Sequence, residues 1–188
     1  MIVKVCGITR REDAEVAADA GASAIGFIFY PKSPRYVTPE KARQVGAGLD
    51  IWKVGVFVDE PAAGIEAVMR AANLDIAQVY GSEMPAGVRF WKALRLRPES
   101  GNDAFAPGGA EAVLLDGPSN GVSFKWFDVR ASYPKVIIAG GLDGANVEEA
   151  IRIAQPWGVD ASSKLEISPG VKNHLKVREF VAKARKIC

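Results

Sequence analysis

The chain has 188 residues, of which 48% are hydrophobic and 24% charged, so it is long enough and apolar enough to bury a core. This composition excludes a disordered or collagen-like chain. The net charge of +2 gives no support to nucleic-acid binding, and no apolar run approaches the roughly 18 residues that would span a membrane. We therefore expect residues 1–188 to form one domain. The two cysteines favour a reducing cytoplasm over a disulfide framework.

Eight short runs of apolar and β-branched residues follow one another along the chain and predict eight β-strands. They cover residues 2–6, 24–29, 52–58, 76–80, 90–96, 112–116, 136–139 and 158–161. Several of these runs are apolar almost throughout, which is typical of strands that are covered on both faces.

Helical patterns separate some of the strands, at residues 11–20, 39–47, 62–72, 146–154 and 172–187. The second pattern has a clear start, because Thr38 is a suitable N-cap and Pro39 suits the first helical position. Other connections carry Gly and Pro and leave room for little helix. They cover residues 81–89, 98–111 and 122–133.

Strands that alternate with helices pair in parallel through right-handed crossovers. Eight such strands in one domain predict an α/β fold of the (β/α)8 TIM-barrel type, with a doubly wound open sheet as the alternative. Because barrels usually need about 200 residues or more, we expect a compact barrel. Its helices should be shortened or missing after the fourth, the fifth and possibly the sixth strand.

Polar residues at the C-terminal ends of the strands are the candidates for an active site, since that end of a parallel barrel carries the chemistry. These positions hold Cys6, Arg35, Tyr80, Asp116 and Asp160. Ordinary structural roles are also open: Cys6 as a small buried side chain, Asp116 as a loop cap and Arg35 as a solvated charge. A thiol and a carboxyl group at one mouth would otherwise supply a base and an acid. The thiol would need a lowered pKa, which Lys4 or Arg35 could promote.

The loops after the seventh and eighth strands predict a phosphate site. They contain Gly140-Gly141 and Ser162-Ser163, which suit an anion, although such residues also form tight turns and cap helices. We interpret His174, the single histidine, as a surface residue, so a metal-hydrolase site or a Ser-His-Asp triad has no support. The simplest chemistry is isomerisation of a phosphosugar by proton transfer, and we expect no metal and no cofactor.

Several longer motifs run in order from the first strand to the last helix, with weak coverage only at residues 81–111. They are Lys-Val-Cys-Gly-Ile-Thr from Lys4, Gly-Phe-Ile-Phe from Gly26, Ser-Pro-Arg-Tyr-Val from Ser33, Val-Gly-Val-Phe-Val from Val54, Ala-Gly-Gly-Leu from Ala139, and the run from Gly158 to Lys172. Together they resemble the phosphoribosylanthranilate isomerase family. The resemblance implies a tryptophan-biosynthesis enzyme. Its reaction converts N-(5'-phosphoribosyl)anthranilate to 1-(2-carboxyphenylamino)-1-deoxyribulose 5-phosphate by an Amadori rearrangement.

The resemblance also implies residue roles. Asp116 is expected to be the general acid that opens the ribose ring, and Cys6, as a thiolate, the general base that removes the C2' proton. Arg35 matches the family arginine beside the anthranilate ring or its carboxylate. The remaining ligand contacts implied are phosphate binding by Gly140, Gly141, Ser162 and Ser163, and a substrate-facing carboxylate at Asp160.

Two positions depart from the family pattern. Tyr80 stands where the family usually has His, and residues 118–121 with Lys125 replace a glycine-rich loop and its usual acid. Two alternatives remain open: a catalytically degenerate barrel that binds a phosphosugar, and a dual-substrate isomerase of the histidine and tryptophan pathways. The histidine-pathway enzymes resemble two-fold repeats with Asp at the end of the first strand, whereas this chain has Cys6 there. The sequence does not distinguish a monomer from a homodimer.

Overall fold

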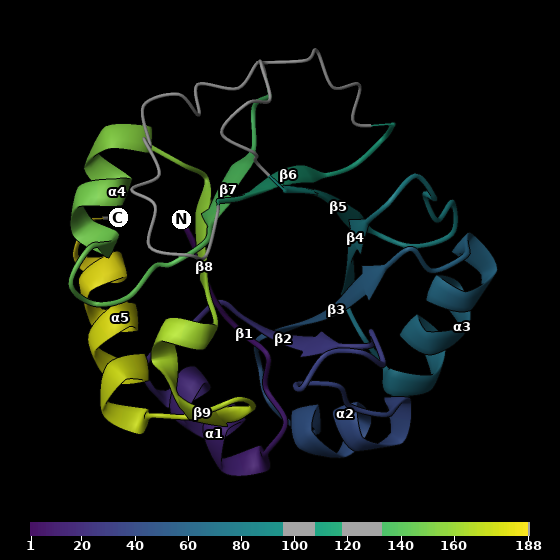
Figure 1. The fold of residues 1–188 in the computed structure, drawn as a ribbon, viewed down its shortest axis with the longest axis horizontal. Coiled ribbons are helices and arrows are strands. Elements are labelled where there is room, and N and C mark those ends of the chain that lie inside the picture. Colours follow the sequence, from purple (N-terminus) through teal and green to yellow (C-terminus); the bar gives the residue numbers. More distant parts are fainter. Residues whose placement is uncertain (96–107, 118–132, 188) are drawn as a thin grey trace.

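The computed structural model describes residues 1–95, 108–117 and 133–187, and the eight predicted strands form one closed parallel barrel (Figure 1). The strands are β1 (Ile2–Cys6), β2 (Ala24–Ile28), β3 (Trp52–Val58), β4 (Ile76–Tyr80), β5 (Phe90–Arg95), β6 (Ala112–Asp116), β7 (Val136–Ala139) and β8 (Gly158–Ala161). Each strand pairs with the next, and β1 closes the ring against β8. The TIM barrel is therefore confirmed, and the open-sheet alternative is wrong.

The described part of the chain has five α-helices on the outside of this ring. They are α1 (Arg11–Asp19), α2 (Pro39–Gly46), α3 (Ala62–Ala72), α4 (Val147–Ala154) and α5 (His174–Lys186). In Figure 1 they flank the part of the ring that holds β1–β3 and β7–β8. Residues 81–89, after β4, contain no helix, as predicted. The shortening predicted after β5 and β6 falls on residues 96–107 and 118–132, outside the described residues.

The helix boundaries follow their caps, with one correction. The Thr38 side chain accepts a hydrogen bond from the Lys41 N–H at 3.2 Å, which starts α2 as predicted. The prediction that the last helix begins at residue 172 is wrong. Residues Val171–Lys172 form a short strand, β10, antiparallel to β9 (Glu166–Ser168), and Asn173 then caps α5. A hairpin therefore separates β8 from the last helix.

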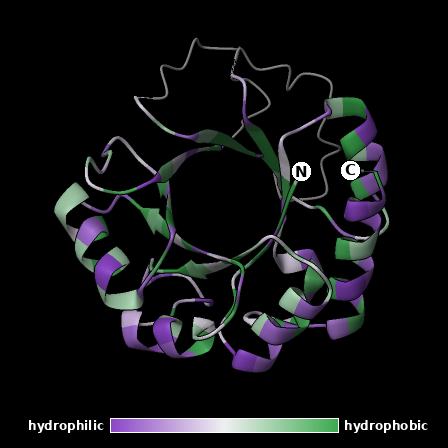
Figure 2. Ribbon diagram, turned by 180° about the vertical axis from the view of Figure 1, so that it is seen from behind, coloured by the Kyte–Doolittle hydropathy of each residue, from purple (hydrophilic) through white to green (hydrophobic). Residues whose placement is uncertain are grey.

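Apolar side chains fill both sides of the barrel wall. The interior cluster includes Val54, Ile76, Trp91, Leu114 and Ile137. The cluster between the strands and the helices includes Ile25, Phe27, Ile65, Val147 and Phe180. Figure 2 shows the matching pattern, with largely hydrophobic strands and helices that also carry hydrophilic residues. No helix in the described ranges is both long and apolar enough to cross a membrane.

The interior is apolar at one end of the barrel and polar at the other. Near the N-terminal ends of the strands, the Trp91 ring packs edge-on against Trp52 and Trp157, with ring centroids 6.3 and 6.1 Å apart. These three aromatic side chains pack together at the N-terminal end of the barrel. The polar interior positions, such as Lys4 and Asp160, lie toward the C-terminal ends, where barrel active sites are found.

Candidate active site

A buried lysine lies at the centre of the barrel mouth. Lys4 and Cys6 both point inward, since side chains two residues apart on a strand share a face. The Lys4 Nζ lies 2.9 Å from Asp160 Oδ2 and 2.9 Å from Gln78 Oε1, and the side chain is fully buried. Burial alone would lower the pKa of Lys4, but the charges of Asp160 and Cys6 and their hydrogen bonds raise it above its ordinary value. Lys4 therefore remains a cation inside the barrel.

The Cys6 thiol is buried beside this lysine. The neighbouring strand makes room for it, because a Cβ at Gly26 would lie only 2.7 Å from the Cys6 sulfur. Burial raises the pKa of Cys6, Lys4 lowers it, and Asp160 raises it further, so that the pKa lies above its ordinary value. Lys4 therefore lowers this pKa as expected, but not enough to bring it below its ordinary value. The desolvation of the thiolate outweighs the attraction of Lys4.

Asp116 lies at the end of β6 and accepts a hydrogen bond from Tyr80. The Tyr80 hydroxyl donates to Asp116 Oδ2 at 3.1 Å, and Gln78 Nε2 donates to the same hydroxyl at 3.3 Å. Burial and the charge of Asp160 raise the pKa of Asp116, against the hydrogen bond from Tyr80 that lowers it. Burial also raises the pKa of Tyr80 well above its usual range. Tyr80 therefore stays a neutral donor, and Asp116 is easier to protonate than an ordinary carboxyl group.

Arg35 is held over the end of β1 and is not a solvated loop charge. Its Nε and Nη2 donate to the two carboxylate oxygens of Glu166 at 2.8 and 2.6 Å, and its side chain is only 19% exposed. Lys172 Nζ donates to Glu166 Oε1 at 2.8 Å. A Cβ at Gly7 would lie 2.7 Å from Arg35 Cδ, so the glycine lets the arginine approach. Glu166 lies in a motif singled out in the sequence, but its pairing with Arg35 was not predicted.

The two predicted phosphate loops meet at the same mouth. Gly140 and Gly141 both have positive φ, at +94° and +69°. A Cβ at Gly140 would lie 2.5 Å from the Gly117 carbonyl oxygen, whereas at Gly141 no described atom lies within 4 Å. Gly140 therefore allows close packing of the loops after β6 and β7, and Gly141 presents bare backbone to an open space.

A serine of the loop after β8 links this loop to β1 by a hydrogen bond. The Ser162 hydroxyl donates to the Cys6 carbonyl oxygen at 3.1 Å and makes no helix-capping bond, while Ser163 begins a short 3-10 helix (Ser163–Leu165). Ser162 thus stands at the N-cap position of this helix, but its side chain bonds to β1 and not to the helix. The bond places the loop after β8 directly beside the strand that carries the thiol.

A buried carboxylate that the sequence analysis missed supports this side of the mouth. Asp13, on α1, accepts hydrogen bonds from Arg10 at 2.7 and 3.0 Å and from the Lys172 N–H at 3.1 Å. His174 Nε2 lies 2.8 Å from its other oxygen. The histidine ring is 42% exposed, as expected of a surface residue, but it is also tied to a fully buried group. Asp13 thus fastens the β9–β10 hairpin and the start of α5 to α1.

The fold and these contacts define the class: a TIM barrel with a thiol and a carboxyl group at its mouth and two loops suited to a phosphate. Within the described ranges, no group of three or more His, Cys, Asp or Glu side chains is placed to hold a metal ion. A thiol and a carboxyl group at one mouth are side chains of the kind that carry acid–base chemistry in enzymes.

Comparison with known proteins identifies the family. The model of N-(5'-phosphoribosyl)anthranilate (PRA) isomerase matches residues 3–183. The N-(5'-phosphoribosyl)anthranilate isomerase of Solibacter usitatus is 46% identical over 198 aligned residues, covering 98% of each chain. The crystal structure of phosphoribosyl anthranilate isomerase from Thermus thermophilus matches with a TM-score of 0.89 and 35% identity over all of both chains. The chain belongs to the PRA isomerase family.

One further solved relative carries a ligand. It is a phosphoribosyl anthranilate isomerase in complex with reduced 1-(o-carboxyphenylamino)-1-deoxyribulose 5-phosphate. It matches with a TM-score of 0.83 and 32% identity, over 99% of this chain and 100% of the relative. That relative therefore binds a phosphosugar compound that carries an aromatic carboxylate.

Proposed function

We propose that this chain catalyses the isomerisation that defines its family, with Asp116 as general acid and Cys6 as general base. One observation carries the assignment of these two residues: a chain of hydrogen bonds crosses the mouth from the lysine beside Cys6 to Asp116. It runs from Lys4 through Gln78 and Tyr80 to Asp116, and the charge of Lys4 acts on the Cys6 thiol. The alternatives that treat Cys6 and Asp116 as structural residues give no reason for such a polar chain inside an apolar barrel.

The first step is ring opening. Asp116 gives its proton to the ribofuranose ring oxygen, the bond from C1' to that oxygen breaks, and the anthranilate nitrogen forms a Schiff base with C1'. The raised pKa of Asp116 supports this role, because it increases the protonated fraction available for donation. Tyr80 supplies the hydrogen bond that orients the carboxyl group.

The second step removes a proton from carbon. The Cys6 thiolate takes the C2' proton, the electron pair moves toward the Schiff base to give an enolamine, and tautomerisation yields the C2' ketone. Lys4 supports this step because its charge stabilises the thiolate against the cost of burial. In the catalytically competent form of the site, Asp116 is therefore protonated and Cys6 is a thiolate.

The rest of the mouth holds the substrate. We assign the phosphate to Gly140, Gly141, Ser162 and Ser163, where bare backbone and hydroxyls suit an anion. Asp160 has one buried carboxylate oxygen without a hydrogen-bond partner among the described residues, which supports a contact with the substrate hydroxyls. Arg35, held flat by Glu166, is placed to lie against the anthranilate ring.

We also propose that residues 1–188 act as one cytoplasmic domain and need no metal or cofactor, because the two proton transfers balance without one. The experiment that tests the function mixes the protein with freshly generated PRA and follows the loss of anthranilate fluorescence. Turnover by the unmodified protein, lost in Cys6→Ala, is the expected result. An unmodified protein that is folded and binds phosphate without turnover would instead favour the degenerate barrel. Turnover of the histidine-pathway aminoimidazole substrate as well would favour the dual-substrate alternative.

A further inference from the structure

The two carboxylate oxygens of Asp160 differ in their surroundings. Oδ2 lies 2.9 Å from Lys4 Nζ, and the same ammonium group donates to Gln78 Oε1 at 2.9 Å, so the carboxylate is held in one orientation. Oδ1 is buried and has no hydrogen-bond partner among the described residues, although the side chain is only 8% exposed. A buried polar atom without a partner costs free energy and is rare in folded proteins. Oδ1 therefore marks a contact that is made with the substrate.

Asp160 lies beside the thiol in the barrel interior. Its neighbours on β8, Val159 and Ala161, pack between the strands and the helices, so Asp160 faces the opposite side, which is the interior. Its register partner on the adjacent strand β1 is Lys4, and Cys6 lies two residues further along the same face. The charge of Asp160 is near enough to raise the pKa of Cys6. The carboxylate and the sulfur therefore act on the same part of a bound substrate.

The proposed reaction contains a proton transfer that Cys6 and Asp116 leave unassigned. After Cys6 has taken the C2' proton, the enolamine still carries a hydrogen on its C2' oxygen. Ketone formation requires this proton to leave while C1' gains one. The Cys6 thiol can supply the proton for C1', because C1' is bonded directly to C2'. A second group must therefore accept the proton of the C2' hydroxyl.

Asp160 is the carboxylate placed for this transfer. C2' carries both the hydrogen that Cys6 removes and the hydroxyl group, so the acceptor has to lie near the sulfur, as Asp160 does. Glu166 has both of its oxygens bonded to Arg35. Asp116 lies on β6, two strands away from β8, at the position assigned to the ring oxygen. Neither of these carboxylates competes well with Oδ1 of Asp160 for the C2' hydroxyl.

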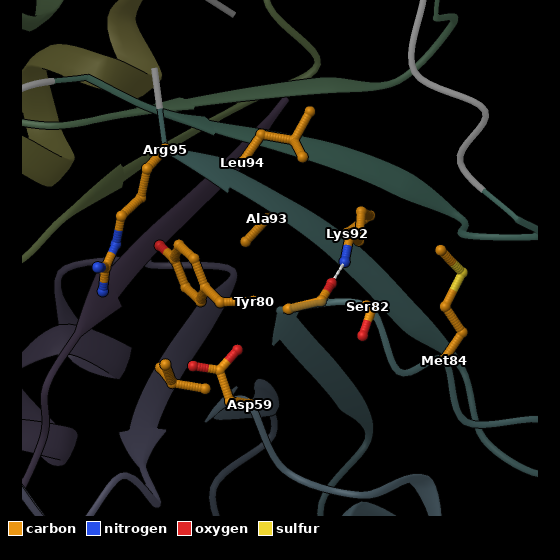
Figure 3. Close-up of a pocket in the computed structure, with 10 residues that line it drawn as sticks. Asp59, Tyr80, Ser82, Met84, Lys92, Ala93, Leu94 and Arg95 are labelled. Carbon is orange, nitrogen blue, oxygen red and sulfur yellow. Dashed lines mark hydrogen bonds between the residues drawn. The ribbon is translucent and has the colours of Figure 1, made fainter. Parts of the chain in front are cut away.

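Asp59 is a further carboxylate, but it belongs to a different part of the mouth. It lines a pocket of about 530 Å³ at the ends of β3, β4 and β5, together with Tyr80 and Arg95 (Figure 3). In the eight-stranded ring these three strands lie opposite β7, β8 and β1. Asp59 is therefore remote from the seam between β8 and β1, where Asp160 and the thiol lie.

We propose that Asp160 is a third catalytic residue, which accepts the proton of the C2' hydroxyl through Oδ1 as the enolamine becomes the ketone. The inference rests on the proposed function and assigns its last step. The O–H bond breaks, and its electron pair forms the C2'=O bond. The electron pair of the C1'=C2' bond takes the proton from the Cys6 thiol and forms the new C1'–H bond, which leaves the sulfur as a thiolate. Asp160 then gives its proton to water, and Asp116 takes one up from water, so that the protons balance.

The test follows the position at which deuterium enters the product when the reaction runs in D2O. The two hydrogens on C1' of the product give separate proton NMR signals, because C3' is a stereocentre. Ketone formation on the protein delivers the proton to one face of C1' only, whereas an enolamine released into water takes up deuterium at both positions. With the unmodified protein, the deuterium at C1' should therefore occupy a single position.

Asp160→Asn keeps the shape of the side chain but cannot accept a proton. The last step on the protein should slow by about 10²-fold or more, the lower range for loss of a general base. The enolamine should then leave first, so that deuterium appears at both C1' positions. Consumption of PRA, followed by fluorescence, should continue, because ring opening and removal of the C2' proton do not use Asp160.

The matched control is Lys4→Met, which breaks the same ion pair but keeps the carboxylate. Its turnover is lower, but its product should carry deuterium at a single C1' position. Thermal melting shows whether each variant is folded. If Asp160→Asn does not fold, the double variant Lys4→Met/Asp160→Leu removes both charges together, which avoids a buried unpaired charge. Any product that it makes should be labelled at both positions, since the position of the label does not depend on the rate.

The other outcomes would overturn the inference. They are a single labelled position with folded Asp160→Asn or with the double variant, and label at both positions with the unmodified protein or with Lys4→Met. Loss of PRA consumption in folded Asp160→Asn would also overturn it, because Asp160 would then act before the ketone forms. If the unmodified protein does not consume PRA at all, the proposed function itself fails and the inference with it.

Discussion

Lys4 and Asp160 form a buried ion pair across the seam where β1 meets β8, with Nζ 2.9 Å from Oδ2. Removing one partner of such a pair leaves an uncompensated charge, which is costly in a barrel interior. The charge of the same lysine lowers the pKa of Cys6, so one residue serves both the closure of the barrel and the ionisation of the thiol. This coupling makes Lys4 the first residue to test.

Replacing Lys4 with Met should raise the pKa of Cys6 further, because the charge that opposes burial is lost. The thiolate fraction then falls, so we expect kcat at neutral pH to drop by about tenfold or more, since one pKa unit is a factor of ten. The pH above which activity declines should also move upward. The check is the pH dependence of Cys6 alkylation by iodoacetamide, with a Cys6→Ser sample as the blank for Cys188. An unchanged alkylation midpoint in a folded variant would contradict this assignment.

Cys6→Ser and Asp116→Asn should each reduce turnover by at least about 10²-fold, the lower range for loss of a general base or acid. Neither change removes a proposed phosphate contact, so both variants should still bind the reduced product analogue. Steady-state kinetics and calorimetric titration separate the two effects. Near-normal rates in either variant would show that the role given to that residue is wrong.

Tyr80→Phe removes the hydrogen bond that lowers the pKa of Asp116, so this pKa should rise. Cys6 is the more basic group, because ordinary thiols titrate near 8.5 and carboxyl groups near 4, and burial raises both. Activity should therefore decline below the pKa of Asp116 and above that of Cys6. In Tyr80→Phe the decline on the acid side should begin at a higher pH, while the alkaline side stays in place. A pH profile of kcat measures both limbs, and a shift of the acid limb to lower pH would refute the argument.

Gly141→Ala should weaken phosphate binding more than it weakens the fold. The glycine has φ +69° and faces open space, so a methyl group would enter the position proposed for the phosphate. The left-handed backbone adds a strain of about 1 kcal/mol. Gly48→Ala is the matched control, since Gly48 has φ +72° and equally open surroundings beyond α2. We expect both variants to melt similarly and only Gly141→Ala to lose affinity for inorganic phosphate. Equal affinities would exclude this loop as the phosphate site.

Asp13→Asn should destabilise the protein by about 2 kcal/mol at neutral pH, the scale of hydrogen bonds to a charged group. Burial raises the pKa of Asp13, but hydrogen bonds from Arg10, the Lys172 N–H and His174 lower it below its ordinary value. Such a group stabilises the fold above its unfolded pKa, near 4, and that stability is lost as pH falls through the folded pKa. The difference in the free energy of unfolding between the unmodified protein and Asp13→Asn should therefore disappear in acid. Urea unfolding at several pH values measures it, with the exposed Asp19→Asn as the control. A difference in the free energy of unfolding that persists at low pH would mean that the shape of the Asp13 side chain, and not its charge, stabilises the fold.

The strands and the strand-end residues were predictable because they depend on local pattern. A run such as Val54-Gly55-Val56-Phe57-Val58 is apolar on both faces, and the order of elements then places Cys6 and Asp116 at one mouth. The start of α5 was not predicted, although Asn173 is an N-cap signal. The preceding Val171 and Lys172 continue the helical spacing and conceal a hairpin that only the pairing with β9 reveals.

The remaining features that the sequence did not predict depend on residues that are far apart in the chain. Glu166 is 131 positions from Arg35, and the Lys172 N–H is 159 positions from Asp13, so no local pattern links them. The pKa of Cys6 is a balance between burial, which raises it, and Lys4, which lowers it. The sequence shows that Lys4 is near, but the extent of burial depends on the completed barrel.

The contacts of β1 also determine when the active site forms during protein synthesis. Lys4 and Cys6 emerge from the ribosome 156 positions before Asp160 and Ser162, to which they respectively bond. Until β8 has emerged, Lys4 has no anionic partner on that side, and a half-made barrel gains little from enclosing it. Fragments abandoned in translation would therefore carry the thiol without its electrostatic surroundings. The Cys6 thiol therefore gains its electrostatic surroundings only after β8 has been synthesised.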